Sequence, residues 1–204
     1  MMKEQIKEIM KDPRGFDMLE NTPNRLSPDE KKQFWSAIEE LVWDGTFHER
    51  YLALGLISWL NNSELGLKLL PSLVDKIDIQ KDSSLIKPIL SIISNNHCHV
   101  YKDYCIKVLK FATETKSEEL SYAAKRCLLV IDWRSIVFDL RDQLDSRKEL
   151  EVVDNLAYFK VYHSRKEWRA LHALLDEEQK KYVKQLMPKI KDRFENHYKP
   201  GLLE

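Results

Sequence analysis

The densest group of metal-binding residue types in this sequence is His97, Cys98 and His99, followed by Cys105. Zinc takes four nitrogen or sulfur ligands in a tetrahedron, and structural sites commonly use spaced pairs such as CxxC. Adjacent His-Cys-His side chains at a helix start point in diverging directions, and Cys105 falls on an apolar face. We therefore expect a loop with two solvated histidines and a core cysteine, with no metal and no other cofactor.

A cysteine nucleophile is the next chemistry to consider. Its thiol needs a lowered pKa from a nearby cation, a histidine or a helix N-terminus. Cys127 lies on the buried stripe of its expected helix, and Cys98 has two histidine neighbours but no other mark of a site. The sequence contains no GxSxG, P-loop, HExxH or GxGxxG motif. An enzyme is thus the less favoured interpretation, and no catalytic residue is assigned.

Two adjacent tryptophan–arginine pairs are candidates for a protein-binding surface. They are Trp133 with Arg134 and Trp168 with Arg169, and Tyr162 lies between them in the sequence. Tryptophan, tyrosine and arginine are the residue types most enriched at the energetic centres of protein interfaces. We expect these five residues to contact a protein partner.

The C-terminal part of the chain suggests a second kind of partner. Lysines and arginines outnumber acidic residues by eleven to seven between Lys160 and Glu204, and aromatic residues are interleaved with them. Cations hold phosphates while aromatic rings stack on exposed bases, so the mixture suits a nucleic acid. That alternative would use Arg126, Lys180 and Lys184. The interspersed carboxylates favour the simpler interpretation, in which the lysines form the solvated face of the last helix.

The elements that must position these residues are all expected to be helices. Capping boxes, in which Ser or Thr is followed three residues later by Glu, are predicted at Ser27, Thr46, Thr115, Ser146 and Ser164. The tetrapeptide Ser-Arg-Lys-Glu opens two of them. Apolar residues between these starts recur with the helical period. We expect helices over 2–11, 28–44, 48–60, 63–77, 84–94, 99–113, 117–131, 134–144, 147–162, 165–175 and 177–198.

Composition bounds the class of protein. The chain has 204 residues, of which 43% are hydrophobic and only five are glycine, and 33 basic residues balance 33 acidic ones. This balance gives no global attraction to nucleic acid or membrane. No stretch approaches the length of a membrane span, the first residues lack the apolar run of a secretory signal, and the three cysteines show no disulfide spacing. We expect a cytoplasmic protein.

Two segments resemble HEAT repeats. SEELSYAAKRCLLVID (117–132) and HERYLALGLISWLNN (48–62) combine a polar start, small residues and a Leu-rich end. Helix starts recur every 15 to 20 residues or so, and two helices with their turns approach the HEAT period. The resemblance implies an all-α fold, an α-solenoid or superhelical stack of HEAT-like antiparallel helix hairpins. We expect a single helical-repeat domain over 1–204, with 1–25 as an N-terminal cap or arm.

One enzymatic branch of that family has a local counterpart. LVWDGTFHERYLALGL (41–56) resembles a segment of the HEAT-like DNA glycosylases that remove alkylated purines. In that family a later Trp-Trp-Asp motif supplies the catalytic carboxylate. The nearest run here is Asp132 with Trp133, which departs from the pattern, so no catalytic role is carried over.

These observations favour a non-enzymatic protein-binding module. Its natural roles are an adaptor, or an immunity or antitoxin-like protein that covers a toxin's active surface. The alternative is a nucleic-acid-binding HEAT-like protein, including a divergent DNA glycosylase. Mixed charge, plentiful aromatic residues and scarce glycine favour the protein partner.

Overall fold

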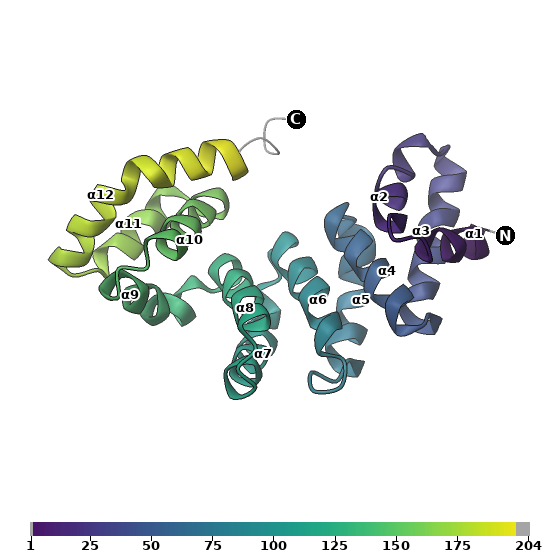
Figure 1. Cartoon of the computed structure of the whole chain (residues 1–204), viewed down its shortest axis with the longest axis horizontal. Helices are drawn as coiled ribbons and strands as arrows, with labels where there is room; N and C mark the ends of the chain where they lie inside the picture. The colour runs from purple at the N-terminus through teal and green to yellow at the C-terminus, as the bar shows by residue number, and fades with distance from the viewer. Residues whose placement is uncertain (1, 199–204) are drawn as a thin grey trace. The chain divides into compact units, whose positions relative to one another are not determined.

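A computed structural model describes residues 2–198, and every regular element in that range is helical (Figure 1). The all-α prediction is therefore confirmed. Twelve α-helices pack mainly against their neighbours in the sequence within this part of the chain. No helix there is both long enough and apolar enough to cross a membrane.

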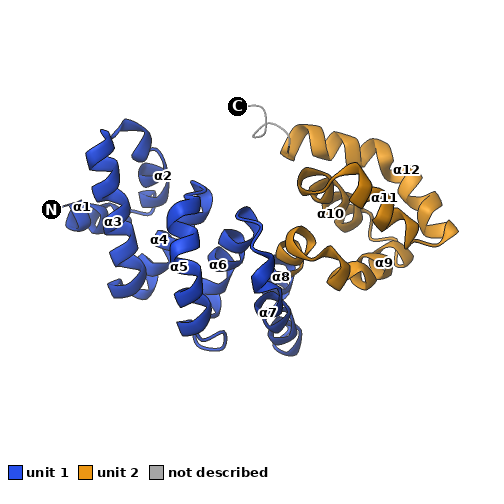
Figure 2. Cartoon of the chain, turned by 180° about the vertical axis from the view of Figure 1, so that it is seen from behind, with its two compact units in different colours: residues 1–124 blue, residues 125–204 orange. Residues whose placement is uncertain are grey.

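The chain divides into two compact units, residues 1–124 and residues 125–204 (Figure 2). The boundary falls inside α8 (Glu118–Ile131). The expectation of one continuous domain stays a prediction, and each unit is described by itself. Unit 1 contains α1 (Met2–Met10), α2 (Gly15–Glu20), α3 (Pro28–Asp44), α4 (Phe47–Trp59), α5 (Ser63–Lys76), α6 (Ser83–Asn95) and α7 (Lys102–Glu114). Unit 2 contains α9 (Val137–Asp145), α10 (Glu149–Tyr162), α11 (Arg165–Ala173) and α12 (Glu177–Arg193).

The core of unit 1 lies among α3, α4, α5 and α6. Helix α4 packs against both α3 and α6, and α5 packs against α6. Two fully buried residues of α4, Leu54 and Ile57, lie in this core with Phe34 of α3 and Leu70 of α5. A glycine permits one of these contacts: a Cβ at Gly66 would lie 2.9 Å from Ile92 Cγ2, so a larger residue would push α5 away from α6.

The N-terminal segment packs on the first helices of this core. Helix α1 contacts α3, and α2 contacts α4. Phe16 of α2 lies so close to Gly55 of α4 that a Cβ there would be 3.2 Å from Phe16 Cε2. The interpretation of 1–25 as a cap stays a prediction, but residues 2–25 do cover part of α3 and α4. Helix α2 was not expected from the sequence.

Unit 2 is built around α10, which packs against α9 and α12. Phe159 is fully buried there. Two buried glutamines join the helices through their side chains: Gln143 of α9 accepts from Asn155 Nδ2 at 3.0 Å, and Gln179 of α12 donates to Asp145 Oδ1 at 2.8 Å. These bonds satisfy polar groups that would otherwise be costly to bury.

Three of the five predicted capping boxes are present. Ser27, Thr46 and Ser164 each accept a hydrogen bond from the amide of the glutamate three residues later, whose carboxylate accepts from the amide of the cap residue. The boxes predicted at Thr115 and Ser146 are wrong. These two residues end α7 and α9 rather than starting the next helices.

The reason is a different turn that occurs four times. Asn61, His97, Lys116 and Arg147 have positive φ angles of 46° to 54°. At Lys116, for example, the amide of Ser117 donates to Ala112 O at 2.9 Å, and the amide of Lys116 donates to Thr113 O at 3.3 Å. This pair of bonds defines the Schellman motif, which satisfies the last carbonyls of a helix. The same two bonds follow α4, α6 and α9.

Candidate interaction surface

The residues of the histidine–cysteine cluster have structural roles: His97 lies in the turn after α6, and Cys105 lies in the core. His97 is the left-handed residue that ends α6, and Cys98 follows it, half-buried, with its thiol donating to Asn96 O at 3.6 Å. Burial raises the pKa of the Cys98 thiol, which opposes the thiolate that a nucleophile needs. Cys105 and Cys127 are buried. Across residues 2–198, no three His, Cys, Asp or Glu side chains are placed to hold a metal ion.

The segment that resembles DNA glycosylases has structural contacts throughout. Glu49 belongs to the capping box of α4, and His48 Nε2 lies 3.3 Å from Met10 O. Arg50 donates through Nε to Val42 O at 3.2 Å, and Lys76 lies over the Trp43 ring at 5.2 Å. These contacts hold α4 against α1 and α3, and α3 against α5, so the residues that carry the resemblance have a packing role here.

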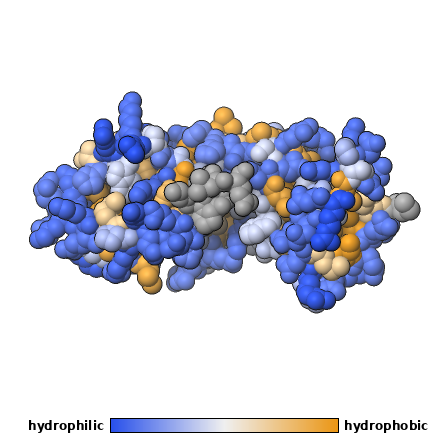
Figure 3. All heavy atoms as spheres, turned by 90° about the horizontal axis from the view of Figure 1, so that it is seen from above, coloured by the Kyte–Doolittle hydropathy of each residue, from blue (hydrophilic) through white to orange (hydrophobic). Residues whose placement is uncertain are grey.

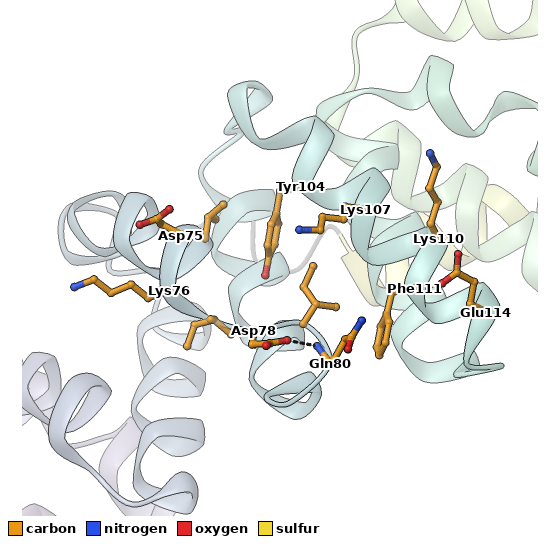
Figure 4. A pocket seen from close by; sticks show the side chains of 12 residues that line it. Asp75, Lys76, Asp78, Gln80, Tyr104, Lys107, Lys110, Phe111 and Glu114 are labelled. Atoms are coloured by element: carbon orange, nitrogen blue, oxygen red, sulfur yellow. Dashed lines mark hydrogen bonds between the residues drawn. The ribbon is translucent and has the colours of Figure 1, made fainter.

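A cavity of about 720 Å³ lies between the loop after α5 and helix α7 (Figure 4). Tyr104 and Phe111 point toward the loop, while Lys76 and Lys110 extend away from it. Asp78 accepts a hydrogen bond from the Gln80 amide at 2.8 Å. This backbone hydrogen bond is the main cause that lowers the pKa of the Asp78 carboxyl. The described lining contains no Ser, Cys or His that could be a nucleophile or its base, so this cavity gives no catalytic assignment.

Three of the residues singled out in the sequence meet in one shallow groove between α11 and α12. Trp168 and Arg169 come from the set predicted to bind a protein, and Lys180 comes from the nucleic-acid set. The groove has a volume of about 510 Å³, and its remaining lining residues are His172, Ala173 and Glu177. Lys180 Nζ forms an ion pair with Glu177 at 2.7 Å across the first turn of α12.

Trp168 is held firmly at this groove. Its ring centroid lies 6.1 Å from that of the buried Phe159, and Lys160 Nζ lies 5.8 Å from the Trp168 ring centroid. The capping box at Ser164 fixes the start of α11, and Glu167 of that box also faces His163 Nδ1 at 3.2 Å. These hydrogen bonds, chiefly the one from the Ser164 amide, lower the pKa of the Glu167 carboxyl.

The other predicted contact residues lie elsewhere in unit 2. Trp133 is only 4% exposed and packs edge-on against Phe159 at 5.8 Å, with Arg134 stacked at 4.7 Å from its ring centroid. Any role of Trp133 in binding would therefore be to support Arg134 from beneath. Lys184 is exposed on α12.

Arg126 and Tyr162 belong to a cluster inside unit 2. Arg126 Nη1 lies 2.6 Å from Asp154 Oδ2, and the guanidinium stacks 3.4 Å from the Tyr158 ring centroid. Tyr162 packs edge-on against Tyr158 at 4.7 Å, and burial raises the pKa of its hydroxyl. Arg126 is thus already neutralised by a carboxylate of its own unit.

Unit 1 carries an aromatic surface that the sequence reasoning missed. We define the aromatic row as Phe47 and Tyr51 of α4 and Tyr122 of α8, which are 50%, 38% and 53% exposed. Phe47 and Tyr51 line a groove of about 260 Å³ with His48, Ser84, Lys87 and Glu119. Tyr122 follows Glu119 by one helical turn and so lies on the same side of α8.

The sequence contained one indication of this row, the spacing of Phe47 and Tyr51 four residues apart on α4. The segment is apolar on nearly every side, however, and this pattern predicted a wholly buried helix. Trp59, the last residue of α4, is also exposed, at 70%. Figure 3 shows that hydrophilic residues dominate the molecular face drawn there, with hydrophobic residues exposed only in separate patches.

No family model matches this sequence, and neither the curated proteins nor the solved structures include a match.

Proposed function

We propose that this protein is a non-enzymatic, HEAT-like helical-repeat module that binds a protein partner in the cytoplasm. Sequential packing of short helices within each unit supports the repeat interpretation. Helices α4 and α6 pack side by side, each joined to its own preceding helix, as expected for consecutive hairpins. The partner would be the target of an adaptor, or the toxin of an immunity-type protein.

The observation that carries the proposal is the aromatic row. Phe47 and Tyr51 are exposed in one groove, and Tyr122 is exposed one helical turn from Glu119 of that groove, although burying each ring would remove substantial apolar area from water. Exposed aromatic groups of this kind mark interaction sites. The charges beside them do not favour a nucleic acid, because Lys87 forms an ion pair with Glu119 and so leaves no uncompensated cation in the groove lining.

The nucleic-acid alternative draws its support from unit 2. Lys180 and the exposed Lys184 are on the same helix, and α11 adds further cations beside them. Arg126, however, is paired with Asp154, and Lys180 is paired with Glu177. Phosphate binding requires cations that are free to replace counterions, so pairing of this kind weakens the alternative.

A photo-crosslinking experiment tests the proposal. p-Benzoylphenylalanine replaces Tyr51 in the aromatic row or Lys81, an exposed loop residue of the same unit, and cells expressing each full-length variant are irradiated. We expect a discrete adduct with a protein at position 51 that resists nuclease and is absent at position 81. The adduct should weaken at least tenfold in the Phe47→Ser/Tyr122→Ser background, since each buried anchor contributes about 1–2 kcal/mol.

Two outcomes would contradict the proposal. One is a nuclease-sensitive adduct, which would support nucleic-acid binding. The other is equal adduct formation at positions 51 and 81, which would show that the aromatic row has no special role. Circular dichroism of each variant verifies that the helices are retained.

A further inference from the structure

We propose that the outer face of α11 binds an acidic protein segment whose carboxylates flank an apolar side chain. This face is defined as Arg165, Lys166, Trp168, Arg169 and His172. The inference rests on the proposed function, because it names the chemistry of a protein partner. It concerns unit 2, whereas the aromatic row that carries the proposed function lies in unit 1.

Three cations of α11 have no carboxylate partner. Several cations of unit 2 do form ion pairs: Lys125 pairs with Asp139, Arg126 and Arg193 with Asp154, Lys189 with Glu149, and Lys180 with Glu177. Within residues 2–198, none of Arg165, Lys166 and Arg169 has an ion-pair partner, and all three are exposed on one short helix, beside Lys181 and Lys184 of α12, which are also unpaired there.

The single acidic residue of α11 forms no ion pair with these cations. Glu167 accepts hydrogen bonds from the amide and hydroxyl of Ser164, and its other oxygen faces His163. The nine-residue helix therefore carries three cations and one carboxylate, a net charge of +2.

The side chains that define this face lie mainly on one side of α11. Residues 165, 168, 169 and 172 follow the i, i+3, i+4, i+7 spacing that places side chains on one side of a helix. Trp168 and Arg169 continue into the groove with Ala173 and Lys180. The tryptophan is held by Phe159 and Lys160, so it offers an ordered apolar contact with little entropy left to lose.

The groove suits a segment that carries carboxylates better than it suits a nucleic acid. Arginine forks match carboxylates as well as phosphates, but this groove offers a single half-buried aromatic ring, and Lys160 lies over it. A nucleic acid needs successive rings for its bases and a continuous line of cations for its backbone. A short acidic segment with one apolar anchor needs only one ring and the few cations that this face provides.

Fluorescence anisotropy with defined probes tests the inference on the full-length protein. The probes are a labelled peptide of about 15 residues with Glu and Asp around a central Leu, the matched peptide with Gln and Asn, and a single-stranded oligonucleotide of equal charge. The variants are Arg165→Glu/Arg169→Glu and, as a control with the same charge change on α7, Lys107→Glu/Lys110→Glu.

We expect the acidic peptide to bind at least tenfold more tightly than the amide peptide and than the oligonucleotide. The α11 variant should lose at least tenfold in affinity, and the α7 control should change by less than about threefold, because exposed charges act mainly at short range. Circular dichroism verifies that the helical content of each variant matches that of the parent.

Three results would overturn the inference. They are tighter binding of the oligonucleotide, equal binding of the two peptides, and equal losses in the two variants. Its failure is separable from failure of the proposed function. A protein adduct at position 51 with no preference for the acidic peptide would reject only the role of α11. Binding of the acidic peptide with no adduct would reject only the role of the aromatic row.

Discussion

At the scale of single residues, Asp154 has the largest set of polar partners in unit 2. Its carboxylate lies 2.6 Å from Arg126 Nη1 and 2.9 Å from Arg193 Nε, and it accepts from the Tyr198 hydroxyl at 2.5 Å. The side chains of Asp154 and Arg126 are 17% and 16% exposed. One carboxylate thus joins α8, α10, α12 and the π-helical turn that follows α12.

Asp154→Asn should therefore lower the free energy of unfolding by about 2–3 kcal/mol, because it leaves two partly buried guanidinium groups without a counter-charge. Urea unfolding followed by circular dichroism measures the change. Asp142→Asn on the exposed side of α9 is the matched control, and it should stay within about 0.5 kcal/mol of the parent. Equal effects of the two substitutions would contradict the assigned role of Asp154.

Residue roles of this kind could be predicted only in part. Arg126 and Arg169 are both arginines on amphipathic helices, and their sequence surroundings gave no reason to treat them differently. Whether each arginine finds a polar partner depends on residues that are distant in the sequence. Asp154 and Tyr198, the partners of Arg126, are 28 and 72 positions away from it. The sequence could name candidate cations, but only the fold could show which of them is paired.

At the scale of elements, helices were predicted well because their signals are local. Helices α3, α4, α5 and α10 agree with the expected ranges to within two residues. The errors occur at helix ends, where two adjacent helices compete for the same residues. The tetrapeptide Ser-Arg-Lys-Glu shows this clearly. At 164–167 it forms a capping box after an extended residue, His163, whereas at 146–149 its serine ends α9 and its arginine adopts the left-handed turn.

The left-handed turns yield an element-scale prediction. A side chain with a Cβ costs about 1–2 kcal/mol in this backbone region, and glycine does not. Lys116→Gly and Arg147→Gly should each raise the free energy of unfolding by about 1 kcal/mol. Lys110→Gly, inside α7, is the control and should lower it by about the same amount. Chemical denaturation measures all three, and a loss of stability at position 116 or 147 would refute the prediction.

At the scale of the whole molecule, the all-α class followed from composition and periodicity. The arrangement of hairpins into a solenoid rests on the HEAT resemblance and remains part of the proposal. Helix α2 escaped prediction because it has only six residues and is positioned by the contact between Phe16 and Gly55. Such a short helix depends on tertiary packing, so no local sequence pattern predicts it.

Acid sensitivity is the prediction for the molecule as a whole. Hydrogen bonds from the cap residues lower the pKa values of Glu30, Glu49 and Glu167 in three helices of both units. A lowered folded-state pKa contributes stability that is present above the unfolded value near 4.3 and is lost as pH falls through the folded value. We therefore expect the urea midpoint to fall steadily below about pH 4.3.

The variant Glu30→Gln/Glu49→Gln/Glu167→Gln separates these carboxyls from all others. Glutamine keeps the capping geometry but does not titrate. Its urea midpoint should depend less on pH over the acid range than that of the parent. An unchanged slope would show that other groups cause the acid sensitivity.

The unpaired cations of α11 have a kinetic consequence that the net charge of zero conceals. Where cations and carboxylates are paired, their fields cancel within a few ångströms, but the field above α11 extends for about a Debye length, near 8 Å at physiological salt. An oppositely charged body diffusing past would be turned toward this helix before any contact forms. Added salt should then lower the association rate constant by more than it raises the dissociation rate constant. The chain would thus steer an acidic partner toward α11 although its own net charge is zero.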